Sequence, residues 1–152
     1  MPAEVVLYDG NKDLQEAELR AKLPDSTHLS IVLGELSDEQ IKALDLVILS
    51  PGVPTDLPVV NRLRDAGLRI WGEVELAWAC GKGDVLAITG TNGKTTTTSL
   101  LGEIMKAWKD EVYVVGNIGT PYTGAAMQMS EQAVTVAEIS SFQLETTEQL
   151  LQ

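Results

Sequence analysis

The stretch Ala87-Ile-Thr-Gly-Thr-Asn-Gly-Lys-Thr-Thr96 decides the fold expected for this chain. Residues 85–89 are apolar and β-branched enough to predict a buried strand, and the apolar spacing over residues 100–108 predicts a helix. The glycines between them let backbone N–H groups turn inward around a phosphate, and the start of the helix adds a partial positive charge. A strand, a glycine loop and a helix in this order predict a nucleotide phosphate site.

The loop residues suit that chemistry one by one. Lys94 offers a point charge for the outer phosphates of a nucleotide such as ATP, and the Thr95 hydroxyl is placed to ligate Mg²⁺. The other expected nucleotide contacts are Gly90, Thr91, Asn92, Gly93 and Thr96. The spacing is Gly-x-x-Gly-Lys-Thr, because Ile88 stands where the general phosphate loop has another glycine. For this short pattern alone, an ordinary glycine turn that caps a helix is the alternative.

Outward from this loop, short apolar runs alternate with amphipathic stretches. The predicted strands are residues 5–8, 29–33, 46–49, 68–71, 85–89, 112–115 and 134–139. The predicted helices are residues 14–23, 38–44, 59–66, 73–80 and 142–151, with glycine stops at 67 and 81 and a capping box at Ser37 and Gln40. This alternation predicts an α/β fold with two parallel-sheet units. The glycines and charges of residues 80–84 place the boundary near Lys82.

The composition of the chain bears on which partners it can bind and where it is located. The 152 residues carry 22 acidic and 11 basic side chains, a net charge of −11, which repels nucleic acid and anionic membrane surfaces. The sequence has no apolar run long enough for a signal peptide or a bilayer span, so no membrane insertion and a cytoplasmic location are expected. The single cysteine, Cys80, has no partner for an internal disulfide and is expected to pack within a helix.

Four blocks of sequence resemble one family. Gly90-Thr-Asn-Gly-Lys-Thr-Thr-Thr-Thr98 is similar to the shortened phosphate loop of the Mur ligase and folylpolyglutamate synthetase superfamily. Glu138-Ile-Ser-Ser-Phe-Gln-Leu-Glu145 resembles a segment typical of the D-glutamate-adding Mur ligases. Gly116-Asn-Ile-Gly119 and Ser50-Pro-Gly-Val-Pro54 follow two other predicted strands and occur in the family's order. Together the blocks cover nearly the whole chain.

The resemblance implies roles around the nucleotide. Glu138 would be the second protein ligand of the nucleotide's Mg²⁺ beside Thr95, and with Lys94 it would carry the catalysis. A carboxylate at the end of a buried strand is costly unless it is paired, and a cation would meet that cost. The alternative is that Glu138 caps a helix that begins near Ser140. Ser140 itself is also open to a capping role.

Other residues would reach the substrate. Asn117 would lie in the substrate or metal region, or else form a simple turn. Ser50, Pro51 and Gly52 would approach a UDP diphosphate, or else form a rigid turn. Asp9 lies at the end of the first predicted strand. It would either lie near the ribose or base of the bound nucleotide or simply be a solvated residue at a strand end.

The implied fold is a partial Rossmann-like domain for the UDP-linked substrate, residues 1–82, and a partial ATP-binding domain, residues 83–152. The implied reaction adds D-glutamate to UDP-N-acetylmuramoyl-L-alanine, with ATP and Mg²⁺, in peptidoglycan precursor synthesis. The family places a glycine-rich loop before the segment corresponding to residues 4–9, and the rest of its ATP domain and a third domain after the segment corresponding to residue 152. We therefore expect this polypeptide alone to be inactive. A general phosphate-loop NTPase and a non-catalytic nucleotide-binding module are the alternatives.

Overall fold

The computed structural model describes residues 3–24, 27–117 and 120–150. The chain divides into two compact units, Met1–Leu44 and Asp45–Gln152, and each is considered by itself. Both are built from parallel strands joined by helices, which confirms the predicted α/β class. Within the described residues, no helix has the length and apolar character needed to cross a membrane.

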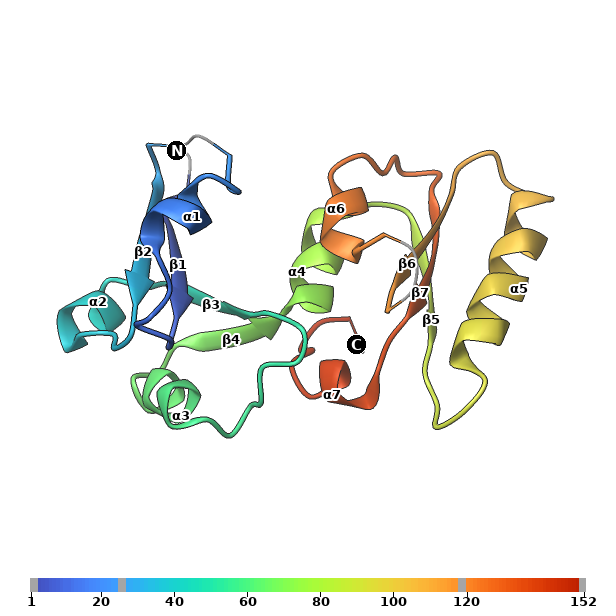
Figure 1. Cartoon of the computed structure of the whole chain (residues 1–152). Coiled ribbons are helices and arrows are strands. Elements are labelled where there is room, and N and C mark those ends of the chain that lie inside the picture. The colour runs from blue at the N-terminus through green and yellow to red at the C-terminus, as the bar shows by residue number, and fades with distance from the viewer. Residues whose placement is uncertain (1–2, 25–26, 118–119, 151–152) are drawn as a thin grey trace. The chain divides into compact units, whose positions relative to one another are not determined.

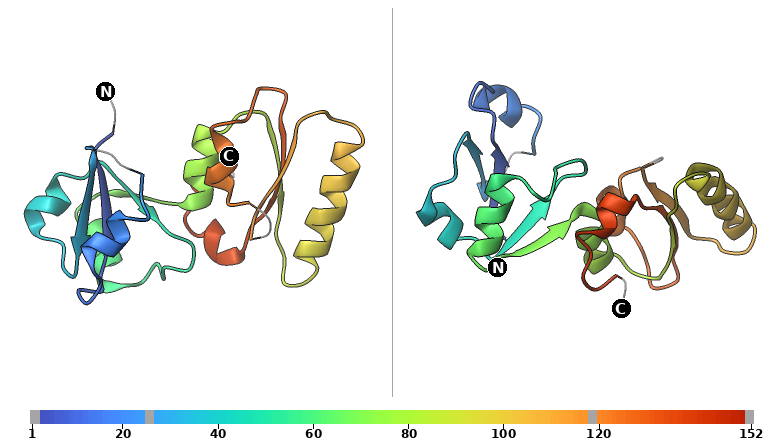
Figure 2. Two further views of the ribbon diagram at one scale, coloured as in Figure 1. Left: turned by 45° about the horizontal axis from the view of Figure 1, so that its top comes forward. Right: turned by 90° about the horizontal axis from the view of Figure 1, so that it is seen from below.

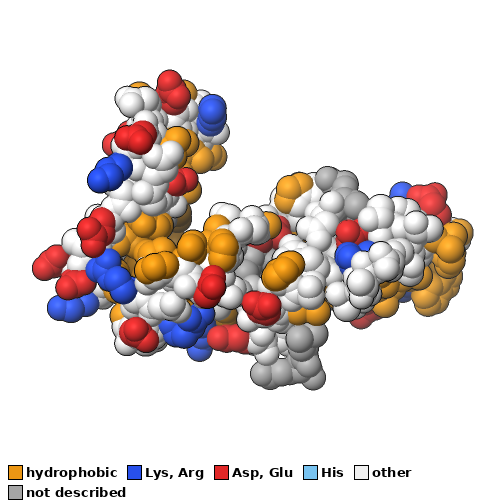
Figure 3. All heavy atoms as spheres, turned by 60° about the horizontal axis from the view of Figure 1, so that its bottom comes forward, with side chains coloured by type: hydrophobic (Ala, Val, Ile, Leu, Met, Phe, Trp, Pro, Cys, Tyr) orange, Lys and Arg blue, Asp and Glu red, His pale blue; other side chains and the backbone are white. Residues whose placement is uncertain are grey.

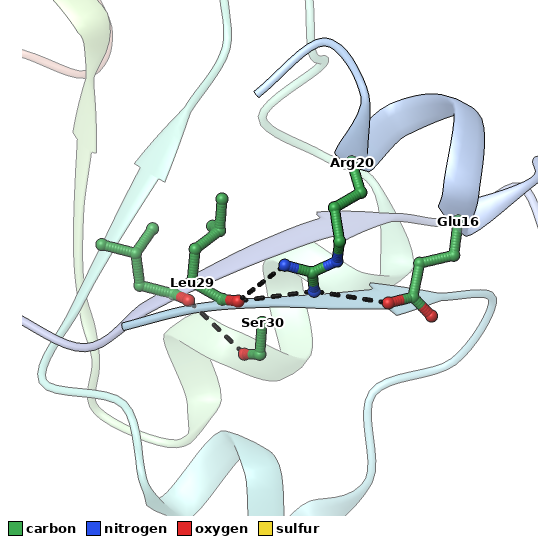
Figure 4. A network of polar contacts seen from close by, with 5 residues as sticks. Glu16, Arg20, Leu29 and Ser30 are labelled. Carbon is green, nitrogen blue, oxygen red and sulfur yellow. Dashed lines mark hydrogen bonds and ion pairs between the residues drawn. The ribbon is translucent and has the colours of Figure 1, made fainter. Parts of the chain in front are cut away.

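In the first unit, two parallel strands pair in a short sheet. Strand β1 (Val5–Asp9) lies beside β2 (Leu29–Leu33), with Val5 opposite Leu29 and Asp9 opposite Leu33. Helix α1 (Glu16–Arg20) is tied to β2 by Arg20, whose guanidinium donates to the carbonyl of Leu29 at 3.4 Å and also pairs with Glu16 (Figure 4). The link explains how so short a helix is held against the sheet.

The helix predicted at residues 14–23 is therefore shorter in the structure. The side chains of Asp9 and Asn11 accept hydrogen bonds from the N–H groups two residues further on, which keeps the chain before α1 in turns. Helix α2 (Asp38–Lys42) begins as predicted, because the Ser37 side chain accepts from the N–H of Gln40 and the Gln40 side chain accepts from that of Ser37.

The second unit contains a three-stranded parallel sheet in the order β5-β7-β6. Its strands are β5 (Asp84–Ile88), β6 (Val112–Gly116) and β7 (Val134–Glu138), and the central strand β7 is buried along its whole length. Figures 1 and 2 show helix α5 (Lys94–Lys106) on one face of this sheet and helices α4 (Glu73–Cys80) and α6 (Tyr122–Ala126) on the other. The helical layers leave the ends of the strands free for a site.

Two more parallel strands belong to this unit. Strand β3 (Leu46–Leu49) pairs with β4 (Arg69–Gly72), and helix α3 (Pro58–Asp65) connects them. After α3 the chain turns at Gly67, whose φ of +80° is the left-handed conformation expected of a helix-ending glycine. Gly81 after α4 has a φ of −77°, so it ends its helix without that conformation.

One feature of α4 differs from expectation. Cys80 is exposed at the end of α4 and does not pack in the core, because α4 buries only its earlier residues against α6. On α5, residues Leu101 and Met105 join the core below the helix. Exposed Leu100, Ile104 and Trp108 form an apolar stripe, and Figure 3 shows hydrophobic side chains gathered over this helix at the right of the view.

The predicted helix at residues 142–151 is wrong. Helix α7 (Ser141–Leu144) stops after four residues, and the chain then turns toward β4 and α4. Thr146 and Thr147 donate their hydroxyls to the carbonyls three residues earlier, the N–H of Gly72 donates to the carbonyl of Thr146, and the fully buried Glu75 accepts from the N–H of Gln149 at 2.8 Å. Tertiary hydrogen bonds thus replace those of a longer helix. Helix α6 was not predicted.

The start of β6 is tied to the segment after α6 by one carboxylate. Glu111 accepts hydrogen bonds from the hydroxyl and N–H of Ser130 and from the hydroxyl of Tyr113. The Ser130 hydroxyl is the main cause that lowers the pKa of Glu111 below its ordinary value. Because hydrogen bonds to the ionised form favour it, this contact stabilises the folded chain when Glu111 is charged.

Candidate nucleotide and substrate site

Three strand ends meet at the carboxyl edge of the β5-β7-β6 sheet. In the register of the sheet, Glu138 at the end of β7 lies between Ile88 of β5 and Gly116 of β6. The N–H of Ile139 donates to the carbonyl of Ile88 at 2.9 Å, and the N–H of Asn117 donates to the carbonyl of Glu138 at 3.3 Å. The edge therefore brings the glycine loop, Glu138 and Asn117 together, in the place where parallel α/β sheets hold ligands.

The glycine loop leads directly into α5. Gly90 and Gly93 have φ angles of +141° and +75°, and Gly93 is the residue before the helix. No side chain caps α5 at Gly93, so the N–H groups of its first turn stay available to an anion. The Lys94 ammonium donates to the carbonyl of Gly90 at 2.8 Å, which folds the side chain back over the loop. This geometry suits a phosphate group.

The other loop residues lie open. Thr91, Asn92, Thr95 and Thr96 are exposed, as are both glycines. None of them lines the cavity described below. The loop is thus a surface cradle formed by backbone and Lys94.

Glu138 is a buried carboxylate that needs a partner. The residue is 4% exposed, and its Oε2 atom has no hydrogen-bond partner among the described residues. It does not cap α7, because Ser140 does: the Ser140 hydroxyl accepts from the N–H of Gln143 at 3.2 Å, and Gln143 returns a contact at 2.8 Å. The capping interpretation is wrong for Glu138 and confirmed for Ser140. A buried, unpaired carboxylate oxygen is costly, and a cation would relieve that cost.

The donor set fits Mg²⁺ held partly by a nucleotide. No group of three or more acidic, histidine or cysteine side chains is arranged for a metal among residues 3–24, 27–117 and 120–150. Mg²⁺ commonly takes one or two protein oxygens and completes its shell with water and phosphates. Thr98, one turn into α5, also has a buried hydroxyl for which the described residues offer no hydrogen-bond partner. Thr98 is not among the predicted site residues, because a threonine inside a helix carries no distinguishing signal.

A groove of about 640 Å³ lies beside this edge, within the second unit. Its wall includes Ser50, Pro51, Gly52 and Asn117, which the sequence analysis had assigned to the substrate. The groove thus brings together two blocks that lie far apart in the sequence. Gly52 has a φ of +86°, which favours glycine in this turn.

The groove also contains residues that were not assigned to the substrate. Gln143 and the 77% exposed Phe142 line it from α7, Ser140 lines it from the N-cap position of that helix, and Glu73 lines it from α4. The first three lie in the block that begins at Glu138, so that block already pointed to them. Glu73 gave no signal, because its place in the groove depends on the packing of α4.

Asp9 belongs to the first compact unit, Met1–Leu44. It is exposed at the end of β1, and its Oδ1 accepts from the N–H of Asn11 at 2.8 Å. This is the geometry of a solvated strand end. Two residues of the Gly116–Gly119 block, Ile118 and Gly119, lie outside the described residues.

Both parts of the chain are similar to domains of known proteins. Residues 3–72 match the Mur ligase MurD-like N-terminal domain, and residues 88–152 match the Mur ligase middle domain. The chain is 54% identical over 146 residues to the UDP-N-acetylmuramoylalanine--D-glutamate ligase of Lachnoclostridium phytofermentans, covering 96% of this chain and 32% of that protein. It is 49% identical over 144 residues to the protein of the same name from Lachnospira eligens, covering 95% of this chain and 32% of the relative.

A third relative with this name, from Clostridioides difficile, is 41% identical over 148 residues, covering 97% of this chain and 33% of that protein. The chain thus spans about a third of the length of the relatives it matches. The two family matches cover β1 to β4 and, from Ile88 on, the glycine loop with β6 and β7. By these matches, the chain belongs to the Mur ligase family.

Proposed function

We propose that this chain supplies the UDP-substrate-binding and ATP-binding parts of a ligase that adds D-glutamate to UDP-N-acetylmuramoyl-L-alanine. The observation that carries the proposal is the in-register meeting of three strand ends, which aligns the glycine loop, Glu138 and Asn117. The groove that joins Asn117 to Ser50 supports a UDP-linked ligand beside that edge. The two substrates come from the name of the relatives.

In this proposal, ATP lies on the glycine loop. Residues Gly90 to Gly93 and Thr96 contact its phosphates through backbone and hydroxyl groups, and Lys94 moves from the Gly90 carbonyl to the outer phosphates. Thr95 and Glu138 would hold Mg²⁺, and this role is supported by the Oε2 atom of Glu138, which has no hydrogen-bond partner among the described residues. Bound there, Mg²⁺ neutralises charge that develops on the phosphoryl oxygens.

The proposed reaction is the one that the family resemblance implies. An oxygen of the L-alanine carboxylate attacks the γ-phosphorus, and ADP leaves with the electron pair of the broken P–O bond. The amine of D-glutamate then attacks the acyl carbon and displaces inorganic phosphate, losing a proton as the amide forms. The chain's part in this chemistry is positioning, since Ser50, Pro51, Gly52 and Asn117 would hold the UDP-linked substrate beside the nucleotide edge.

The proposal also covers domain organisation and location. We assign residues 1–82 to a Rossmann-like substrate domain, with Asp9 near the nucleoside, and residues 83–152 to the ATP domain. The contacts of the chain divide it earlier, after Leu44, and the two family matches leave residues 73–87 between them. We also propose that the reaction belongs to peptidoglycan precursor synthesis and takes place in the cytoplasm, where ATP is available.

Ligand titrations of the isotope-labelled chain test the proposal. Mg-ATP is expected to shift the amide signals of Gly90, Gly93 and Lys94, and UDP-N-acetylmuramoyl-L-alanine those of Gly52 and Asn117. UDP-glucose, which keeps the nucleotide but lacks the muramoyl-alanine group, is the control and is expected to bind more weakly. Steady ATP hydrolysis that does not depend on the UDP-linked substrate would instead favour a general NTPase, and absence of any shift at Gly52 and Asn117 would contradict the substrate assignment.

A further inference from the structure

We propose that Glu73 is a positioning residue, which acts through Thr123 to hold Asn117 in the wall of the substrate groove. The inference rests on the proposed function for the identity of the ligand. Its structural basis is a set of contacts that link α4, α6 and the end of β6.

One carboxylate oxygen of Glu73 accepts hydrogen bonds from the first turn of α6. Its Oε1 accepts from both the N–H and the hydroxyl of Thr123, each at 2.7 Å. Thr123 is the second residue of α6, and Pro121 at the N-cap position makes no side-chain capping contact. Glu73, the first residue of α4, therefore takes the place of the missing cap from a neighbouring helix.

The start of α6 in turn fixes the end of β6. The carbonyl of Thr120, three residues before Thr123, accepts from the N–H of Gly116 at 3.3 Å. The next N–H, that of Asn117, donates to the carbonyl of Glu138. Gly116 lies close against β7, because a Cβ atom there would lie 2.1 Å from that same carbonyl oxygen. The position of Asn117 thus depends on where Thr120 and α6 begin.

Glu73 lines the groove but is poorly suited to contact the diphosphate of a UDP ligand. A carboxylate repels a diphosphate, and Oε1 is already shared between two donors. Its neighbour on α4, Glu75, is committed to the N–H groups of Gln149 and Leu150 on the segment after α7. The first turn of α4 therefore holds the segments that follow both β6 and β7.

Hydrogen exchange in the ligand-free chain tests the positioning itself. We expect Glu73→Ala to speed amide exchange at Gly116, Asn117 and Thr123 at least tenfold, while Ile139, on the other side of β7, exchanges within twofold of the parent. Glu73→Gln keeps an oxygen that accepts from both Thr123 donors and is expected to restore slow exchange. Glu103→Ala on the exposed face of α5 is the matched control and is expected to change none of these rates.

Ligand affinity gives the functional readout. Glu73→Ala is expected to weaken UDP-N-acetylmuramoyl-L-alanine binding at least tenfold, with Mg-ATP affinity within twofold of the parent and with rescue by Glu73→Gln. Thr123→Val, which removes only the hydroxyl, gives a second route if the alanine variant does not fold, and an intermediate loss is expected. If the parent chain does not bind the UDP-linked ligand, the proposed function fails while the exchange rates still decide the positioning role. Unchanged exchange in both Glu73→Ala and Thr123→Val would overturn the inference, and a Gln variant as weak as the Ala variant would assign Glu73 a direct charge contact instead.

Discussion

Replacing Glu138 by Gln is expected to stabilise the ligand-free chain while abolishing most of its response to magnesium. Glu138 is 4% exposed and its Oε2 lacks a partner within the described structure. A buried unpaired charge costs several kcal/mol, whereas a buried neutral polar group without a partner costs about 1 to 3 kcal/mol. The amide should therefore recover at least about 1 kcal/mol, which corresponds to a rise in Tm of about 2 to 4 °C for a chain of this size.

The assay compares thermal unfolding in EDTA with unfolding in ADP and Mg²⁺. A ligand at a hundred times its Kd adds about 2.7 kcal/mol to the stability of the parent, and the magnesium-dependent part of that gain should be lost in Glu138→Gln. Glu103→Gln, an exposed carboxylate on α5, is the control and is expected to stay within about 0.5 kcal/mol of the parent. A lower Tm in Glu138→Gln together with an unchanged response to magnesium would refute the reasoning.

Three further changes test other parts of the structure. Lys94→Ala should weaken Mg-ATP binding by at least about 1.5 kcal/mol in calorimetric titration, the loss of one charge-assisted contact, while Lys109→Ala leaves it unchanged. Gly116→Ala should lower the free energy of unfolding, measured by urea titration, by about 2 kcal/mol or more, because the new Cβ meets a carbonyl oxygen of β7 at 2.1 Å and φ is +107°. Full stability would contradict the register at this edge. The pKa of Glu111 is lowered in the folded chain, so its contact with Ser130 stabilises the chain above the unfolded-state pKa and is lost as pH falls through the folded-state pKa. Glu111→Gln should therefore make the free energy of unfolding, measured in urea, fall less steeply at acid pH. An equally steep fall in the variant would contradict this role of Glu111.

Most of the secondary structure followed from local pattern. Strands β2 and β3 have the predicted bounds, and α2 begins at the capping box that Ser37 and Gln40 form. These features depend on neighbours in the sequence, since alternation of apolar runs and a side chain that reaches three residues along are local properties. The end of α7 did not follow from local pattern, because the segment after it is held by distant groups: the N–H of Gly72 on β4 donates to the carbonyl of Thr146, and the N–H of Gln149 donates to Glu75.

The site divides in the same way. The sequence by itself determined the glycine loop with Lys94, the strand that ends in Glu138 and the family of the chain, because a phosphate loop requires those residue types at a fixed spacing. Tertiary structure alone decided which strand ends are neighbours, and so brought Asn117 to Glu138. It also decided that Glu73 reaches Thr123 across 50 residues of sequence. Pairing and burial are relations between distant segments, and their energies depend on packing that no local spacing encodes.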